Sequence, residues 1–188
     1  MEYIFDTHAH YDDEAFDEDR ESLIGSLREN GIGNVCNIGA SMESCRTTLA
    51  MAEKYPFFYG ALGIHPNETK DLTEEDMDWL RKASGSEKIV AIGEIGLDYY
   101  WHKEKEEHLL QQKVFRQQMD IAREKKLPFM IHSRDAAEDT LNIVKEYMQD
   151  GMYGGVIHCF SYSKEIAREY LNMGLYLGIG GVVTFKNA

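Results

Sequence analysis

Short apolar runs alternate with longer amphipathic stretches along the whole chain, and this alternation limits the possible folds more than any other feature. It is the α/β pattern of βα units that build a parallel sheet. We expect seven strands, over residues 3–7, 34–39, 57–64, 89–95, 128–132, 154–159 and 175–180. Six helices are expected between them, near residues 17–30, 41–54, 73–84, 104–126, 135–149 and 163–173. Such a chain forms either an open doubly wound sheet or a closed (β/α)8 barrel.

Local signals mark several ends of these helices. Thr73 is a candidate N-cap because Asp76 follows three residues later, as in a weak form of the capping box. Gly31 and Gly151 follow helical stretches at the position of a left-handed C-cap. No Gly/Ser-rich or Pro-rich linker interrupts the pattern, so we expect a single domain over residues 1–188.

The balance of charges restricts the possible partners. Among the 188 residues, 33 are Asp or Glu and 20 are Lys or Arg, which gives a formal net charge of −13. Proteins that bind nucleic acid mainly through its phosphates usually carry a basic face. Any contact of this chain with nucleic acid therefore needs another source of positive charge, and bound divalent metal ions would supply it.

The cellular compartment is predicted from the first residues, the hydropathy and the cysteines. The sequence starts without a basic region followed by an apolar one, and no run reaches the ~18 apolar residues of a membrane span. We therefore expect a cytoplasmic protein with no membrane segment. Cys36, Cys45 and Cys159 are odd in number and scattered, so we expect buried free thiols rather than a disulfide framework.

Residue types that bind metal occur where the predicted strands end. In a barrel, functional groups from many strands converge at the carboxyl-terminal face, whereas an open sheet concentrates them at one switch point. Glu94 and five of the seven histidines fall at or just past such strand ends, namely His8, His10, His65, His132 and His158. Several separate strands therefore deliver ligands to one rim, which favours the barrel.

His8 and His10 are predicted to share one ion. They form a His-x-His pair on an extended segment, where residues two apart point to the same face. Imidazole and carboxylate together suit zinc, manganese, iron or magnesium, and a carboxylate can bridge two ions. The sequence contains neither a phosphate-binding loop nor a serine-nucleophile motif. Metal-assisted hydrolysis is thus the favoured chemistry.

Six blocks of the sequence resemble, in the same order, the signatures of the TatD family of metal-dependent deoxyribonucleases, which is related to the amidohydrolase superfamily. They cover residues 4–10, 63–66, 93–98, 128–136, 158–161 and 180–188. The resemblance extends over the whole chain and implies a TIM-like (β/α) barrel with a two-metal site. In the family's pattern, His8, His10 and Glu94 would hold one ion, and Glu94 would bridge to a second ion. His132 and His158 would hold that second ion.

The same resemblance implies the reaction and its other participants. The expected activity is that of a 3'-5' exonuclease that cleaves phosphodiester bonds in DNA with a water activated by two Mg²⁺, Mn²⁺ or Zn²⁺ ions. Glu94 is the expected catalytic residue, since it is the only carboxylate among the ligands. His65 would lie beside the substrate, and Arg134 is a candidate contact for phosphate oxygens.

The length of the chain is short for a complete barrel, which typically needs about 250 residues. The family also continues past the equivalent of Ala188 with a Glu-Thr-Asp block that supplies a metal-binding aspartate. We therefore expect a TIM-like barrel that lacks its last one or two βα units. Unpaired strand edges in such a barrel would favour self-association.

Two other functions fit the same residues. Similar barrels hydrolyse amides, esters or lactones, including the acyl groups on tRNA, and shared metal ligands do not separate these substrates. The chain would then be an amide or ester hydrolase, such as an aminoacyl-tRNA deacylase. A non-catalytic metal-binding fragment is the third possibility, motivated by the family's aspartate that this sequence lacks.

Overall fold

A parallel sheet of seven strands in chain order forms the centre of the computed structural model, which describes residues 3–186. The strands are β1 (Ile4–Ala9), β2 (Ile32–Ile38), β3 (Phe58–Leu62), β4 (Ile89–Asp98), β5 (Phe129–Arg134), β6 (Gly155–Ile157) and β7 (Tyr176–Leu177). Every neighbouring pair is parallel, as the alternating pattern predicts. Parallel neighbours need a crossover connection, which is usually a helix.

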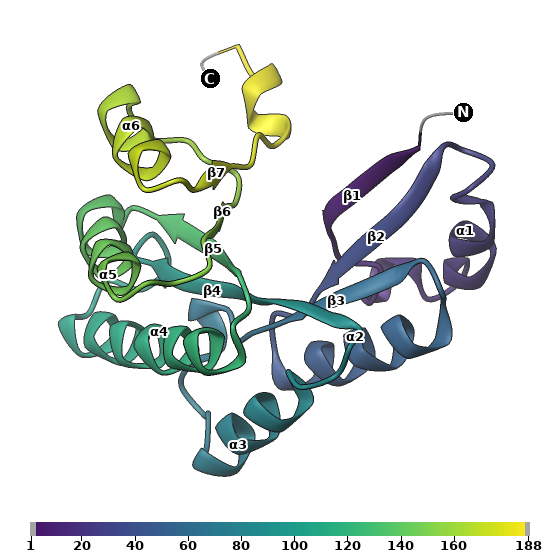
Figure 1. Ribbon diagram of the computed structural model, residues 1–188, viewed down its shortest axis with the longest axis horizontal. Helices are drawn as coiled ribbons and strands as arrows, with labels where there is room; N and C mark the ends of the chain where they lie inside the picture. Colours follow the sequence, from purple (N-terminus) through teal and green to yellow (C-terminus); the bar gives the residue numbers. More distant parts are fainter. Residues whose placement is uncertain (1–2, 187–188) are drawn as a thin grey trace.

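Six α-helices make these crossovers, one between each pair of successive strands. They are α1 (Arg20–Ser26), α2 (Met42–Lys54), α3 (Glu74–Ala83), α4 (Lys105–Lys125), α5 (Ala137–Gln149) and α6 (Lys164–Asn172). Short 3-10 turns add η1 (Glu14–Phe16), η2 (Pro66–Glu68) and η3 (Gly181–Thr184). The α-helices lie along the outside of a curled sheet (Figure 1). Among the described residues, no helix combines the length and the apolar character that crossing a membrane requires.

The curled sheet is an incomplete barrel. Within residues 3–186, β1 pairs with β2 and β7 pairs with β6, but β1 and β7 do not pair with each other. The two strands stand on opposite sides of an opening (Figure 1). This arrangement confirms the expected TIM-like (β/α) barrel without its final units. It leaves one edge of β1 and one edge of β7 free for further pairing.

Burial of apolar side chains between the sheet and α4 holds the middle of the fold together. On α4, Val114, Phe115 and Met119 are at most 3% exposed and form the buried face of an amphipathic helix. The strand β4 is buried along almost its whole length, as expected for a parallel strand covered on both faces. The central strands therefore provide a rigid base for the side chains at their carboxyl-terminal ends.

Two of the three predicted helix ends agree with the structure, and the one at Gly31 does not, because α1 ends earlier, at Ser26. Thr73 forms a complete capping box, because its hydroxyl accepts from the N–H of Asp76 and the Asp76 carboxylate accepts from the N–H of Thr73. Gly31 and Gly151 have φ angles of 86° and 81°. Both angles lie in the left-handed region that a residue with a side chain rarely adopts.

Several strand boundaries differ from those predicted. Residue 95 is the predicted end of the fourth strand, but β4 continues to Asp98. The extra residues pair with β5, from Gly96 with His132 to Asp98 with Arg134. In contrast, β7 has two residues where six were expected, since it has a partner on one side only before the chain turns into η3. The last of the six blocks that resemble the family covers residues 180–188, and its positions 187 and 188 lie outside the described residues.

One cysteine contradicts the expectation of three buried thiols. Cys36 and Cys45 are buried, with exposures of 4% and 0%, whereas Cys159 is exposed. The predicted strand reaches residue 159, but β6 ends at Ile157 and Cys159 has a φ angle of 42°. The alternation of a strand therefore does not apply to Cys159, and its side chain lies outside the core. All three cysteines are free thiols.

Candidate metal centre

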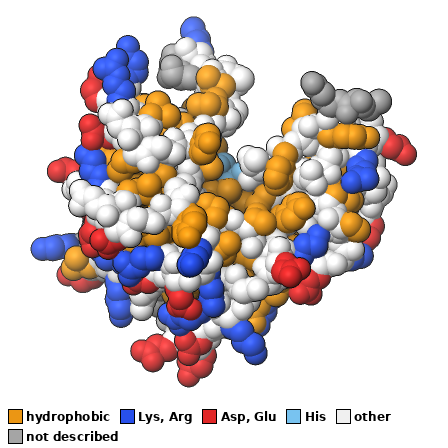
Figure 2. Space-filling view, viewed as in Figure 1, with side chains coloured by type: hydrophobic (Ala, Val, Ile, Leu, Met, Phe, Trp, Pro, Cys, Tyr) orange, Lys and Arg blue, Asp and Glu red, His pale blue; other side chains and the backbone are white. Residues whose placement is uncertain are grey.

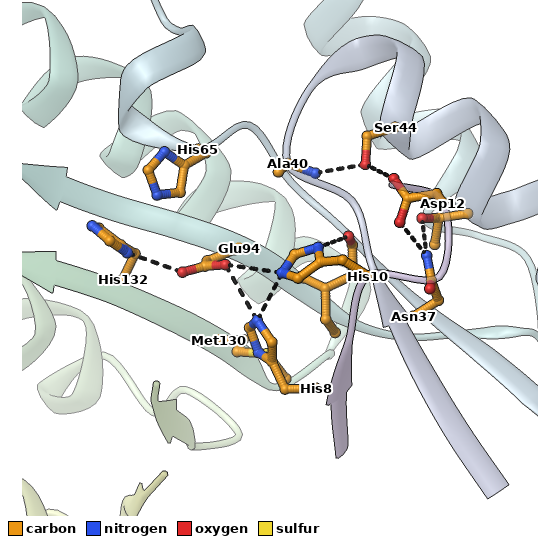
Figure 3. Close-up of polar contacts among 12 residues, drawn as sticks. His8, His10, Asp12, Asn37, Ala40, Ser44, His65, Glu94, Met130 and His132 are labelled. Carbon is orange, nitrogen blue, oxygen red and sulfur yellow. Dashed lines mark hydrogen bonds and ion pairs between the residues drawn. The ribbon is translucent and has the colours of Figure 1, made fainter. Parts of the chain in front are cut away.

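Glu94 stands at the centre of the histidine cluster. Its side chain, 7% exposed, comes from the buried strand β4. One carboxylate oxygen, Oε2, lies 3.3 Å from Nε2 of His8 and 3.7 Å from Nε2 of His10. The other oxygen, Oε1, lies 3.0 Å from Nδ1 of His132. A single carboxylate from β4 thus contacts histidines of β1, of the segment after β1 and of β5 (Figure 3).

Contacts at the Nδ1 atoms orient the rings of His8 and His10. Nδ1 of His10 lies 2.9 Å from the carbonyl oxygen of Ile38, and Nδ1 of His8 lies 2.7 Å from the sulfur of Met130. Because a carbonyl oxygen and a thioether sulfur only accept, both Nδ1 atoms carry hydrogen and donate. The two Nε2 atoms, 3.2 Å apart, therefore point their lone pairs at the same region.

This convergence fits a bound cation. Two imidazole lone pairs and an ionised carboxylate repel one another unless a positive charge lies between them. The three ligand atoms of His8, His10 and Glu94 all lie within 4.8 Å of one another. Nitrogen and carboxylate oxygen are donors that zinc, manganese and related ions accept. The residues present therefore fit a divalent metal ion.

A second group of possible ligands shares Glu94 with the first. It consists of His65, Glu94 and His132, whose ligand atoms also lie within 4.8 Å of one another. The rings of His65 and His132 have centroids 4.3 Å apart and meet at 65°. Since each oxygen of Glu94 faces a different group, the carboxylate is placed between two possible ion positions.

Asp98 supports His132 from the side away from Glu94. Its Oδ2 lies 3.0 Å from Nε2 of His132, and its side chain is 2% exposed. Burial lowers the pKa of His132, but its hydrogen bonds to Glu94 and Asp98 outweigh this effect and raise that pKa overall. Burial likewise raises the pKa of Glu94, but the hydrogen bond from His132 and the charge of that ring outweigh it and lower that pKa. Glu94 is therefore ionised.

The role of Asp98 is absent from the sequence prediction. A signal was available, because Asp98 ends the Gly93–Asp98 block and stands at the end of a strand, as the predicted ligands do. Carboxylates that accept from the second nitrogen of a metal-binding histidine fix its orientation. Asp98 has the position of such a carboxylate toward His132.

His65 differs from His8 and His10 in its tautomer. Its Nδ1 accepts a hydrogen bond of 3.2 Å from the N–H of Asn67, at the start of η2. Burial is the main reason that the pKa of His65 falls to about 4, so the ring is neutral at pH 7. A neutral ring that accepts at Nδ1 carries its hydrogen on Nε2. In this state neither nitrogen of His65 offers a free lone pair to an ion, and Nε2 presents a hydrogen-bond donor.

The remaining two predicted residues lie outside both ligand groups. The ring of His158 stacks on that of His8, with centroids 3.5 Å apart and an angle of 11° between planes. Burial lowers the pKa of His158 to about 4. Arg134 is exposed, and its guanidinium carbon lies 3.9 Å above the ring of Tyr100. The structure thus brings His158 against the cluster and leaves Arg134 at its margin.

A polar network supports the segment that carries His10. The carboxylate of Asp12 accepts from the amide of Asn37 at 2.8 Å and from the hydroxyl of Ser44. The amide oxygen of Asn37 in turn accepts from the N–H of Tyr11 at 2.6 Å. This network, beside the cluster in Figure 3, was also not predicted from the sequence. It fixes the chain that follows His10.

Solvent reaches the cluster from the open side of the barrel. The molecule is hollowed between its two arms, with a histidine visible at the bottom and hydrophobic side chains along the walls (Figure 2). A cavity of about 260 Å³ borders His8 and His158, and another of about 290 Å³ borders His10 and His65. A small substrate segment can therefore approach the cluster from two sides.

A half-barrel with histidines and a shared glutamate at the carboxyl-terminal ends of its strands is the arrangement of a metal-dependent hydrolase. The family model described as TatD related DNase matches residues 5–188, and the chain belongs to this family. It is 44% identical over 185 residues to the uncharacterized metal-dependent hydrolase YabD of Bacillus subtilis, covering 98% of this chain and 71% of that protein.

Two further relatives agree with this assignment. The 3'-5' ssDNA/RNA exonuclease TatD of Cronobacter sakazakii is 33% identical over 180 residues, which cover 96% of this chain and 67% of that protein. The crystal structure of YjjV, a TatD homologue from Escherichia coli, superposes with a TM-score of 0.87 at 30% identity. The superposition covers 98% of this chain and 71% of YjjV. The fold and the family thus agree with the resemblance found in the sequence.

Proposed function

We propose that this protein is a two-metal phosphodiesterase that removes nucleotides from the 3' end of single-stranded DNA. The observation that carries the proposal is the position of Glu94 between two groups of possible ligands, one with His8 and His10 and one with His132. A pair of ions bridged by a carboxylate is a common arrangement for in-line displacement at phosphorus. The name of the Cronobacter relative, a 3'-5' ssDNA/RNA exonuclease, supports the polarity and the substrate.

The residues would divide the binding of Mg²⁺, Mn²⁺ or Zn²⁺ between them. His8, His10 and Glu94 would hold one ion. Glu94, His132 and His158 would hold the other, with His158 reaching it from its position against His8. Bound divalent ions supply activation of water and neutralisation of the phosphate charge. Positive charge of this kind offsets the net charge of −13, which would otherwise repel a nucleic acid.

The protein's own side chains would then position the substrate. The Nε2–H of His65 would donate to a phosphate oxygen, since its Nδ1 is occupied by the N–H of Asn67. The guanidinium of Arg134 would offer further donors to the phosphates at the margin of the site. Glu94 would be the catalytic residue, because its two oxygens face both ligand groups, between which the phosphate would bind.

The free cysteines support a reducing compartment for this activity. Cys36, Cys45 and Cys159 are all unpaired, as in most proteins of the cytoplasm, where thiols are kept reduced. A cytoplasmic nuclease of this kind would act on exposed ends of single strands. Long duplexes would be poorer substrates.

Cleavage of end-labelled DNA tests the proposal. Single-stranded DNA labelled at its 3' or its 5' end is incubated with the protein and Mn²⁺, beside the variants Glu94→Gln and Glu146→Gln. Glu146 is a matched control because it lies on the surface, where it pairs with Arg116. We expect stepwise shortening from the 3' end by the wild type and Glu146→Gln and none by Glu94→Gln. Cleavage of carboxyl esters or aminoacyl-tRNA without cleavage of DNA would overturn the proposal in favour of an ester hydrolase.

A further inference from the structure

Two exposed aromatic rings follow the strand that carries Glu94. Tyr100 and Trp101 come directly after β4 and are 42% and 63% exposed. Their ring centroids lie 4.6 Å apart, and the planes meet at 87°. Large aromatic side chains left in solvent beside a binding site are typical of surfaces that bind a partner.

Two cationic side chains, Arg134 and Lys103, lie close to these rings. The guanidinium carbon of Arg134 lies 3.9 Å from the centroid of Tyr100 and 5.5 Å from that of Trp101, and Nζ of Lys103 lies 5.4 Å from that of Tyr100. Within residues 3–186, the guanidinium of Arg134 forms no hydrogen bond or ion pair. Several other arginines of this acidic chain pair with carboxylates, namely Arg20, Arg81, Arg116 and Arg123. Arg134 therefore keeps its donors available to an anion.

Asp98 joins the rings to the metal centre. Its Oδ1 accepts from the N–H of Tyr100 at 3.0 Å and from the N–H of Trp101 at 3.2 Å. Its other oxygen, Oδ2, faces His132. Because this carboxylate is buried, the backbone that carries both rings is held at a fixed position relative to His132. The same carboxylate therefore holds both His132 and the backbone from which the two rings extend.

We propose that Tyr100, Trp101 and Arg134 form a platform that binds an unpaired nucleobase next to the phosphate at the metal centre. This inference rests on the proposed nuclease function. Bases that are free of a duplex stack on aromatic rings and on guanidinium planes, and a neighbouring phosphate can accept from the same arginine. A base-paired nucleotide shows no free face to stack. The platform therefore selects single strands, without preference for one base.

Fluorescence of Trp101 tests the platform directly. The chain contains two tryptophans, so in the variant Trp79→Phe the tryptophan fluorescence comes from Trp101 alone. The probe is a short single-stranded oligonucleotide with phosphorothioate linkages in Mg²⁺, compared with an abasic oligonucleotide of the same length and linkage. We expect saturable quenching and binding about tenfold tighter for the oligonucleotide that carries bases. Absence of quenching, or equal affinity for both probes, would overturn the platform.

Steady-state cleavage gives an independent measurement. Trp101→Ala is expected to raise KM for single-stranded DNA about tenfold, and Trp101→Phe to restore most of the loss. Tyr153→Ala is the matched control, because Tyr153 is 62% exposed but precedes β6 at the opposite rim of the sheet. Circular dichroism checks that each variant folds. If Trp101→Ala and Tyr153→Ala have the same KM as the wild type, the platform does not bind the substrate.

The two measurements separate the platform from the proposed function. Quenching that depends on the bases, without cleavage of DNA in Mn²⁺, would support the platform and overturn the nuclease. Cleavage of DNA with no response of the Trp101 fluorescence to either oligonucleotide would support the nuclease and overturn the platform. The expected result is both base-dependent quenching and cleavage.

Discussion

Asp98 and Glu94 contact opposite nitrogens of the same ring: each carboxylate has an oxygen 3.0 Å from His132, Asp98 at Nε2 and Glu94 at Nδ1. The imidazole cannot rotate without losing one of these contacts. Both carboxylates come from β4, and His132 comes from the neighbouring strand β5. The pairing of two strands thus determines the direction in which a possible metal ligand points.

Asp98→Asn is expected to reduce turnover without unfolding the protein. The amide keeps the size of the side chain but removes the charge that orients His132. Loss of such a supporting carboxylate typically lowers metal affinity or activity 10–100-fold, and we expect a loss of about 10-fold or more here. Asp139→Asn is the control, since Asp139 accepts from Tyr99 and Gln112 on the same side of the fold. Measured kcat and Mn²⁺ affinity that are equal in the two variants would contradict this role of Asp98.

His65→Ala is expected to weaken substrate binding and to leave the Mn²⁺ affinity unchanged. The lost donor would raise KM for single-stranded DNA about tenfold, because hydrogen bonds to charged groups contribute about 1.5–3 kcal/mol. His65→Gln, which keeps an N–H donor, should recover part of this loss. Calorimetric titration with Mn²⁺ provides the check. A fall in Mn²⁺ affinity equal to that of His132→Ala would instead identify His65 as a metal ligand.

The cysteines are expected to react very unequally in the native protein. Burial raises the pKa values of Cys36 and Cys45 to about 12, so both stay protonated and shielded at pH 8. Cys159 is exposed, although its pKa is also raised by partial burial and by Glu94. Mass spectrometry after iodoacetamide should show one adduct, gained faster as the pH rises and absent from Cys159→Ser. Rapid labelling of Cys45 in the folded chain would contradict its burial.

The free edges of the barrel are expected to cause self-association. Large apolar side chains are exposed near both of them, with Ile4 at 63% on the β1 side and Val183 at 62% beyond β7. Unpaired strand edges and contiguous apolar surface favour contact between copies. Sedimentation equilibrium should show a mass that increases with concentration, and less so for Ile4→Lys or Val183→Lys. A constant monomer mass across a wide concentration range would rule this out.

The course of the chain was largely predictable because its signals are local. Hydrophobic periodicity located all seven strands and six helices within residues 3–186, and the left-handed Gly151 stands where α5 ends. The period of an extended segment also predicts that His8 and His10 face the same region, as their 3.2 Å separation shows. Such features depend on neighbours in the sequence alone.

Other features depend on contacts between distant segments and were not predictable in this way. The extension of β4 to Asp98 requires pairing with β5, and Gly96 has a φ of 144° where an added side chain would meet the backbone of His132. Without that register, the sequence does not indicate that Asp98 reaches His132. The early end of β6, which exposes Cys159, likewise depends on how far its neighbours extend.

Occupancy of the metal centre and cleavage of DNA, measured on the same samples, test the central claim most directly. The protein is stripped with a chelator and titrated with Mn²⁺, while free Mn²⁺ is followed by electron paramagnetic resonance and cleavage of end-labelled single-stranded DNA is recorded. We expect no cleavage by the stripped protein and a rate that rises with bound Mn²⁺. Glu94→Gln should bind less Mn²⁺ and cleave nothing. Cleavage at the wild-type rate by the stripped protein or by Glu94→Gln would contradict a metal-dependent nuclease centred on Glu94.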